Sequence, residues 1–135
     1  MLNPATPAFL ETLAARLPED TLRPAEPRYL SDPRGRVSGQ AAAVALPRSA
    51  EGVSEIVRAC HEASVGVIPF GGGTGLVLGQ VMAAGPAPLL VSLERMRAIR
   101  AIYPEENVLS GCFRCRSPAR ARHGSAAIFR PMRAG

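Results

Sequence analysis

The amino-acid sequence predicts an α+β fold organised around an α/β-like strand–helix–strand unit. Three short apolar segments, residues 41–47, 65–70 and 87–93, have the length and composition of buried strands. An amphipathic helical pattern separates the first two segments, and four glycines in five positions follow the second. A strand, a helix and a strand within about 30 residues form a βαβ unit, whose right-handed crossover makes the first two strands parallel.

The N-terminal 40 residues predict one helix and one irregular segment. Thr6 followed by Pro7 resembles a helix N-cap with proline at the first helical position. Apolar side chains then recur at helical spacing and predict a helix over residues 7–17: Phe9, Leu10, Leu13 and Leu17. Residues 21–40 contain several prolines, glycines and scattered charges, so we expect an exposed segment without regular structure there.

The segment from Ser49 to Gly66 gives the clearest helical pattern in the chain. Ser49 is a suitable N-cap, and Glu51 and Glu55 lie near the positive end of the helix dipole. The predicted apolar stripe comprises Val53, Ile56, Val57, Cys60 and Ala63. We therefore expect Cys60 to be a small buried side chain.

Composition and charge exclude several classes of protein. No uninterrupted apolar run approaches the roughly 18 to 20 residues of a membrane-spanning helix, and the N-terminus lacks a secretory pattern, so we expect a cytoplasmic protein. The net charge of +5 arises in the last 26 residues, which contain six arginines and no acidic residue. Two cysteines and one histidine there are too few for a structural zinc site, so no metal is expected. The same tail offers only Phe113 and Phe129 for stacking, so no nucleic-acid partner is expected.

The glycine cluster "GGGTG", Gly71 to Gly75, follows the carboxyl end of a predicted strand, where open α/β sheets hold their ligands. Glycine permits positive φ and lets an oxyanion approach backbone N–H groups without meeting a Cβ atom. The cluster is therefore either a simple turn or a pyrophosphate-binding loop, and Thr74 adds a hydroxyl suited to a phosphate oxygen. The spacing does not fit the Rossmann pattern GxGxxG, and the absence of lysine excludes a Walker A loop and protein-kinase chemistry.

The stretch "VGVIPFGGGTGLVLGQV", followed by "LLVSLERMRAI", resembles the N-terminal part of the FAD-linked oxidases with a p-cresol methylhydroxylase (PCMH) type FAD-binding domain. The most similar members are the D-2-hydroxy-acid enzymes, namely the flavin-binding chain of glycolate oxidase, D-lactate dehydrogenase and D-2-hydroxyglutarate dehydrogenase. "YLSDPRG" and "AVALPRSAEGVSEIVRACHEASVGVIPFGGGTGL" agree with this family in the same order. The resemblance covers about residues 25–108.

The resemblance implies that a Pro-x-Gly-Gly-x-Thr-Gly-Leu element wraps the FAD pyrophosphate with main-chain amides. The matching positions are Pro69, Gly71, Gly72, Gly73, Thr74, Gly75 and Leu76. Members often continue with a Gly-Gly pair, where this chain has Leu78-Gly79. Relatives that attach flavin covalently near this loop use a histidine, and none lies between Val65 and Met96, so we expect non-covalent FAD.

The resemblance also implies an activity for the complete enzyme. In such oxidoreductases a small 2-hydroxy acid passes its α-hydrogen as hydride to flavin N5 while a base removes the hydroxyl proton. The substrate-binding and basic residues of the family lie in segments without a counterpart here, so no catalytic residue is assigned. "SLERMRAI" is expected to edge the FAD subdomain, with Leu93, Met96 and Ile99 packed and its charged residues solvated.

The family pattern is lost after residue 109. We therefore expect a helix and an irregular segment over residues 1–40, a truncated PCMH-type domain over 41–109, and a disordered arginine-rich tail over 110–135. A shifted reading frame, a diverged truncated copy or a genuinely short protein each account for this change. Two rival functions stay open: a non-catalytic product of a disrupted gene, and a small module that binds an anionic partner through the tail.

Overall fold

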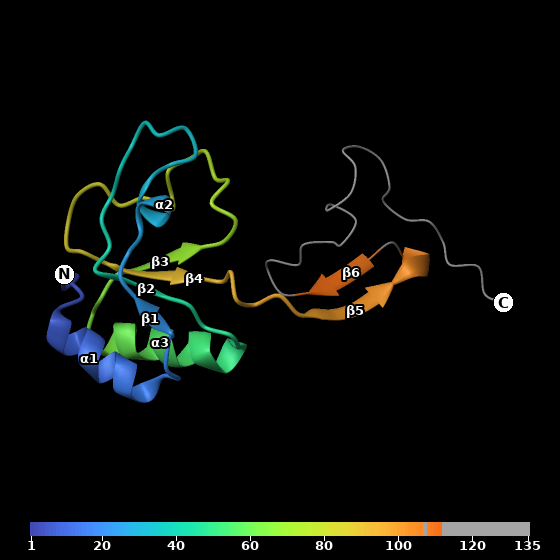
Figure 1. Ribbon diagram of the computed structural model, residues 1–135, viewed down its shortest axis with the longest axis horizontal. Coiled ribbons are helices and arrows are strands. Elements are labelled where there is room, and N and C mark those ends of the chain that lie inside the picture. The colour runs from blue at the N-terminus through green and yellow to red at the C-terminus, as the bar shows by residue number, and fades with distance from the viewer. Residues whose placement is uncertain (107, 112–135) are drawn as a thin grey trace.

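The computed structural model describes residues 1–106 and 108–111 of the chain, and its centre is a four-stranded sheet (Figure 1). The strands lie in the order β1-β2-β4-β3. The first strand is antiparallel to its neighbour, and the other three are parallel to one another. Their bounds are β1 Leu22–Arg23, β2 Ala43–Ala45, β3 Val67–Phe70 and β4 Leu89–Ser92.

The predicted βαβ unit is present, with one difference in strand order. Helix α3 (Ala50–Glu62) connects β2 to β3, and these two strands are parallel as expected. They are not neighbours, because β4 lies between them. All four residues of β4 are buried, which suits the central position, whereas Pro69 in β3 has no N–H to donate and is tolerated on an edge strand.

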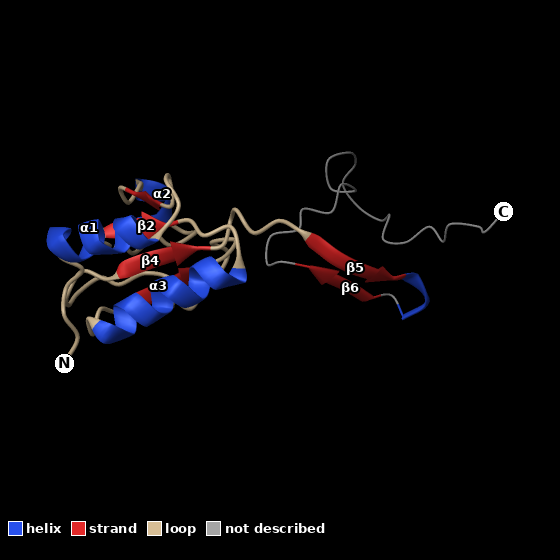
Figure 2. Cartoon of the chain, turned by 90° about the horizontal axis from the view of Figure 1, so that it is seen from below, coloured by secondary structure: helices blue, strands red, loops and turns tan. Residues whose placement is uncertain are grey.

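Each face of the sheet has its own apolar core. Helix α1 (Pro7–Arg16) and helix α3 lie along one face, and the short helix α2 (Pro27–Leu30) lies on the other (Figures 1 and 2). The α1–α3 core contains Leu13, Ile56, Ala59 and Cys60 against Leu89 and Val91. The α2 core contains Tyr29, Val44, Leu46, Phe70 and Leu90. Alternate residues of β2 and β4 serve opposite faces, as the pleat of a strand requires.

Both predicted long helices are confirmed with their caps. The Thr6 hydroxyl accepts a hydrogen bond from Phe9 N, and Ser49 Oγ accepts one from Gly52 N. The predicted stripe of α3 needs one correction. Val57 is 47% exposed, and Ala59 is buried in its place. Ile56 and Cys60 are buried as expected.

The prediction that residues 21–40 lack regular structure was wrong in two places. Strand β1 has only two residues, held by pairing with β2, and α2 is a single helical turn that begins at Pro27. Elements this short show no periodicity, so only the proline at the first helical position marks α2 in the sequence.

A two-stranded hairpin follows the main sheet. Strands β5 (Ile99–Tyr103) and β6 (Val108–Gly111) are antiparallel, with a 3-10 helix over Pro104–Glu106 between them. Strand β6 runs past the predicted domain boundary at residue 109. The rest of the predicted tail, with Cys112, Cys115 and His123, lies outside the described residues. None of the helices described here is long and apolar enough to cross a membrane.

Candidate functional site

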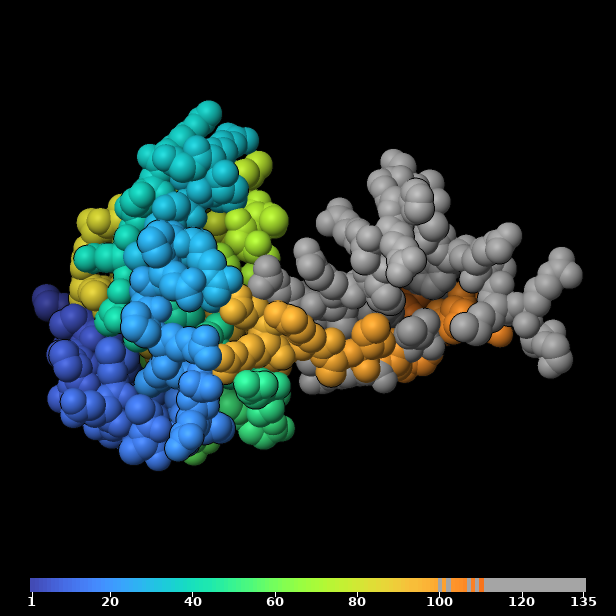
Figure 3. All heavy atoms as spheres, viewed as in Figure 1, coloured from blue at the N-terminus to red at the C-terminus, as the bar shows by residue number. Residues whose placement is uncertain are grey.

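The glycine loop, defined here as residues 71–80, begins directly after β3 at the carboxyl edge of the parallel strands. Most of its residues are exposed. It lies beside the segment of residues 30–40, and these two segments form one end of the main body in Figure 3. A hydrogen bond of 2.9 Å from Gln40 N to Met82 O joins the second segment to the chain just after the loop.

Gly73 occupies the tightest position in the loop. Its φ angle is +71°, and a Cβ atom there would lie 2.9 Å from the Phe70 ring carbon Cζ. A larger side chain at position 73 would meet both backbone strain and a steric clash. Gly72 is different, because a Cβ atom there would have no contact closer than 3.8 Å. The position that requires glycine is therefore the one where the backbone crosses the Phe70 ring.

The amides at the apex of the loop are available to a ligand. Within the described part of the chain, the N–H groups of Gly73, Thr74 and Gly75 have no hydrogen-bond acceptor. Consecutive amide donors in a glycine-rich turn form a concave site for anions. The loop thus has the donors and the absence of Cβ atoms that a pyrophosphate group needs.

Gln80 and Leu78 shape the far end of the loop. Gln80 Nε2 donates a 3.2 Å hydrogen bond to the Gly73 carbonyl oxygen. Leu78 has a φ of +63°, and a turn follows it in which Val81 N donates to Leu78 O. This turn brings the carboxamide of Gln80 back to the apex, so the loop closes on itself.

Two aromatic rings support the loop from below. The rings of Phe70 and Tyr29 meet edge to face, with centroids 5.1 Å apart and an interplanar angle of 78°. The Tyr29 hydroxyl donates a 3.0 Å hydrogen bond to Glu94 Oε1. Burial and this bond to Glu94 together raise the pKa of Tyr29. The support of Gly73 therefore runs from Phe70 through Tyr29 to Glu94, just beyond β4.

Arg28 completes this polar cluster. Its Nη2 donates to the Tyr29 hydroxyl at 2.6 Å and pairs with Glu94 Oε1 at 3.4 Å, while its Cζ lies 4.4 Å from the centroid of the Tyr29 ring. Its Nε also pairs with Glu26 at 3.1 Å. The guanidinium is thus already engaged by two carboxylates, although half of the side chain remains exposed.

Asp32 holds the turn after α2. Its carboxylate accepts hydrogen bonds from the amides of Val37, Arg34 and Arg36, at 2.8, 3.1 and 2.6 Å. These bonds, with the Val37 amide first, hold the pKa of Asp32 below its usual range. Its oxygens are occupied by the protein backbone, so Asp32 shapes the wall of the site.

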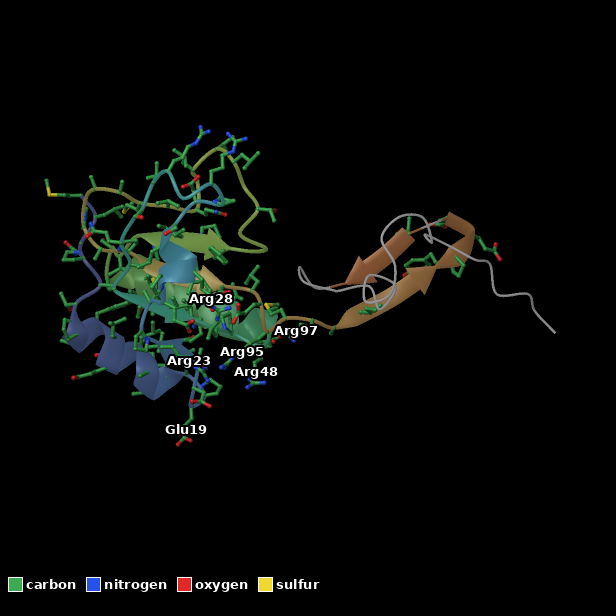
Figure 4. All side chains as sticks on the ribbon, turned by 45° about the horizontal axis from the view of Figure 1, so that its top comes forward. Glu19, Arg23, Arg28, Arg48, Arg95 and Arg97 are labelled. Carbon is green, nitrogen blue, oxygen red and sulfur yellow. The ribbon has the colours of Figure 1, made fainter. Side chains whose placement is uncertain are left out.

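A cavity of about 360 Å³ lies between the glycine loop and α2. Its lining combines two carboxylates and one guanidinium with aromatic and glycine surface: Arg28, Tyr29, Ser31, Asp32, Pro33, Phe70, Gly72, Gly73 and Glu94. Further arginines lie on the same side of the main body as Arg28: Arg23, Arg48, Arg95 and Arg97 (Figure 4). Because the Arg28 guanidinium is already paired with Glu26 and Glu94, the loop amides are the best donors beside the cavity for a phosphate oxygen.

Only some of the predicted site residues line this cavity. Gly72 and Gly73 line it, Gly71 leads into it, and Pro69 lies within β3. Thr74, Gly75 and Leu76 lie at the exposed apex of the loop. Sequence reasoning missed the residues that support the loop: Arg28, Tyr29, Asp32, Gln80 and Glu94. Glu94 was expected to be solvated, but its side chain is only 13% exposed.

A family model described as an FAD binding domain matches residues 41–110, which is just over half of the chain. The chain belongs to this family of FAD-binding domains. The match begins just before β2 and ends in β6, so it contains the βαβ unit, the glycine loop and the hairpin. FAD is therefore the cofactor of the family, as the resemblance implied.

Known relatives agree with this assignment. Over 81 residues, this FAD-binding domain is 35% identical to the mitochondrial D-2-hydroxyglutarate dehydrogenase of Danio rerio, and the match covers 60% of this chain and 14% of the relative. The chain thus spans about a seventh of that protein.

Solved structures share the fold. An alkyldihydroxyacetonephosphate synthase superposes with a TM-score of 0.62 at 22% identity, over 80% of this chain and 22% of that one. A berberine bridge enzyme variant gives 0.58 at 17% identity, over 77% and 23%. p-Cresol methylhydroxylase gives 0.52 at 16%, over 78% and 22%. The described chain is a partial PCMH-type FAD-binding domain with an α+β fold.

Proposed function

We propose that this chain supplies the pyrophosphate-binding part of the FAD site in an oxidoreductase that acts on 2-hydroxy acids. The observation that carries the proposal is the glycine loop, whose amides, those of Gly73, Thr74 and Gly75 among them, have no acceptor among the described residues. Gly72 and Gly73 line a cavity at the carboxyl edge of the sheet. The similarity to a D-2-hydroxyglutarate dehydrogenase supports the hydroxy-acid class.

The residues present fit the pyrophosphate group of FAD. Gly73 could not carry a side chain, and Gly72 and Gly75 leave room at the surface of the loop. We assign cofactor binding to Pro69, Gly71, Gly72, Gly73, Thr74, Gly75 and Leu76. In this assignment the amides of Gly73, Thr74 and Gly75 donate to phosphate oxygens, and the Thr74 hydroxyl adds a fourth donor.

FAD would supply the redox chemistry by accepting the hydride of the substrate's α-carbon. The contribution of this chain is to bind and orient the diphosphate. No described residue is assigned to proton transfer with the substrate. The substrate and any partner chain belong to the complete enzyme.

FAD titration of the 135-residue chain tests the proposal. Quenching of flavin fluorescence should report binding, and ADP and inorganic pyrophosphate should compete, because they present the same diphosphate. Riboflavin, which has no phosphate, should not compete. Competition by riboflavin would contradict the proposal that the diphosphate is the group recognised. No binding of FAD, pyrophosphate or ADP would also contradict the proposal and would favour the product of a disrupted gene.

Two alanine variants of the same loop sharpen this test. Gly73→Ala introduces a Cβ atom against Phe70 at a positive φ, and we expect FAD affinity to fall at least tenfold. Gly79→Ala is the matched control, because nothing lies within 4 Å of a Cβ atom there. Equal affinities for the two variants would argue that the apex does not contact FAD.

A further inference from the structure

We propose that Gln80 is a positioning residue that sets the direction of the Thr74 amide toward the cofactor's diphosphate. This inference rests on the function proposed above and concerns the same loop. Gln80 lies outside the Pro-x-Gly-Gly-x-Thr-Gly-Leu element, seven residues after Gly73, and is brought to the apex by the turn at Leu78.

The direction of the Thr74 N–H follows from the geometry of the peptide bond. In a trans peptide, the carbonyl of one residue and the N–H of the next point in opposite directions. Gln80 Nε2 holds the Gly73 carbonyl oxygen at 3.2 Å, so the N–H of Thr74 points to the opposite side of the loop. One side-chain hydrogen bond thus fixes the orientation of a backbone donor.

The need for such a bond follows from the glycines. Turning the Gly73–Thr74 peptide over changes ψ of Gly73 and φ of Thr74, and glycine permits the change in ψ because it has no Cβ atom. If the Gly73–Thr74 peptide turned over, a carbonyl oxygen would replace the N–H on the side of the loop away from Gln80 and repel a phosphate oxygen. The Arg28 guanidinium in the cavity lining is a poor substitute, since it is already paired with Glu94 and Glu26.

The Gln80 carboxamide also lies against the second half of the apex. Its Oε1 is 3.6 Å from where a Cβ atom of Gly75 would be, which is ordinary contact distance. Gln80 therefore spans the loop from Gly73 to Gly75 and is partly buried there. A side chain placed this way acts through the backbone and needs no direct contact with FAD.

Gln80→Ala tests the inference with a matched control. Removing the carboxamide should weaken FAD binding about 10- to 100-fold, the range for losing a hydrogen bond to a charged group. Gln40→Ala removes a similar bond, from Gln40 Nε2 to Gly85 O at 2.7 Å, outside the glycine loop. This control should leave FAD affinity unchanged. Equal loss of affinity in the two variants would overturn the inference.

Gln80→Glu should change the pH dependence of FAD affinity, which a purely structural role of Gln80 would not do. A protonated glutamic acid at this position can donate to the Gly73 carbonyl, whereas the ionised carboxylate cannot and repels it. The FAD affinity of Gln80→Glu should therefore approach that of the wild type near pH 4 and fall below that of Gln80→Ala near pH 7, around the ordinary glutamate pKa of about 4.3. Asp32, Glu94 and Arg28, on the cavity side of Gly73, are the same in both variants, so their titration affects both curves. Parallel curves for the two variants would overturn the inference.

A ligand-free measurement separates this inference from the proposed function. The amide NMR signal of Thr74 should shift in Gln80→Ala and stay in place in Gln40→Ala. If the wild type binds neither FAD nor pyrophosphate while the Thr74 signal shifts, the proposed function fails and the role of Gln80 in orienting the peptide stands. If the Thr74 signal does not shift, the role of Gln80 fails whether or not FAD binds.

Discussion

Leu78 has the backbone conformation of a glycine. Its φ of +63° lies in the left-handed region, which costs a residue with a Cβ atom about 1–2 kcal/mol. The family resemblance implies a Gly-Gly pair where this chain has Leu78-Gly79, and the positive φ of Leu78 agrees with that expectation. The side chain is 42% exposed and belongs to neither of the two apolar cores of the described residues.

Leu78→Gly should therefore stabilise the protein. We expect the free energy of unfolding to rise by about 0.5–1 kcal/mol, since relief of the left-handed strain exceeds the added flexibility of glycine. Urea denaturation followed by circular dichroism measures the change. Leu76→Gly is the control, because Leu76 is exposed in the same loop and is not among the residues with positive φ. It should be neutral or slightly destabilising, and equal effects for both variants would contradict the account of Leu78.

Asp32 links the stability of the turn after α2 to pH. The amides of Val37, Arg34 and Arg36 favour the ionised carboxylate, so the pKa of Asp32 is lower in the folded state than in the unfolded chain. Its contribution to stability is complete above the unfolded pKa of about 3.9 and is lost as the pH falls through the lower, folded pKa.

Asp32→Asn should remove this contribution. The difference in melting temperature between wild type and Asp32→Asn should be largest near pH 6 and shrink steadily below about pH 4. Thermal melts across that range measure it. A difference that stays constant down to about pH 2 would show that the carboxylate charge does not stabilise the turn.

Helix α3 shows which features of a helix can be predicted from sequence periodicity alone. Its start at Ser49, its length and the burial of Ile56 and Cys60 follow from the sequence. Val57 was placed in the stripe and Ala59 was not, because the sequence pattern ranks residues by apolarity whereas the helix turns Ala59 toward α1 and the sheet. A small alanine fits where a helix packs closely, and the larger valine is left at the edge of the stripe.

The loss of stability caused by alanine substitutions along α3 should depend on the burial of the replaced side chain and not on its apolarity. Ile56→Ala empties a fully buried position and should destabilise the protein by about 2–5 kcal/mol. Val57→Ala should change the free energy of unfolding by less than about 1 kcal/mol, because nearly half of that side chain is already exposed. Chemical denaturation of the two variants provides the comparison. Similar losses of unfolding free energy in the two variants would show that Val57 contributes to the core as Ile56 does.

The elements that sequence reasoning missed are those that depend on distant partners. Tyr29 is buried because α2 lies on the sheet face formed by Val44, Phe70 and Leu90, and nothing in residues 21–40 alone indicates that contact. Gln80 reaches Gly73 only because of the turn at Leu78. The glycine loop itself was visible in sequence because it is contiguous. Its supports were not, since they come from three separate segments.

Across the whole molecule, the sheet divides the protein into a structural side and a site side. The core under α1 and α3 holds the βαβ unit together, and the core under α2 carries the aromatic pair that supports the glycine loop. The sequence predicted the α+β class and the parallel pairing, because apolar strands and one amphipathic helix determine them locally. It could not predict that β4 would separate β2 from β3, since strand order depends on which strand is buried on both faces.

Neighbouring residues of β4 allow the two sides to be tested separately. Leu89 and Leu90 are both almost fully buried, but Leu89 packs in the α1–α3 core and Leu90 in the α2 core. Because both belong to one sheet, Leu89→Ala and Leu90→Ala should each lower the free energy of unfolding by about 2–5 kcal/mol in a single transition. Of the two, only Leu90→Ala should weaken FAD binding by the folded protein at low temperature, since it loosens the layer beneath Phe70 and Gly73. If Leu89→Ala loses as much FAD affinity as Leu90→Ala, the glycine loop depends on the overall stability of the protein and not on the face of the sheet on which it is built.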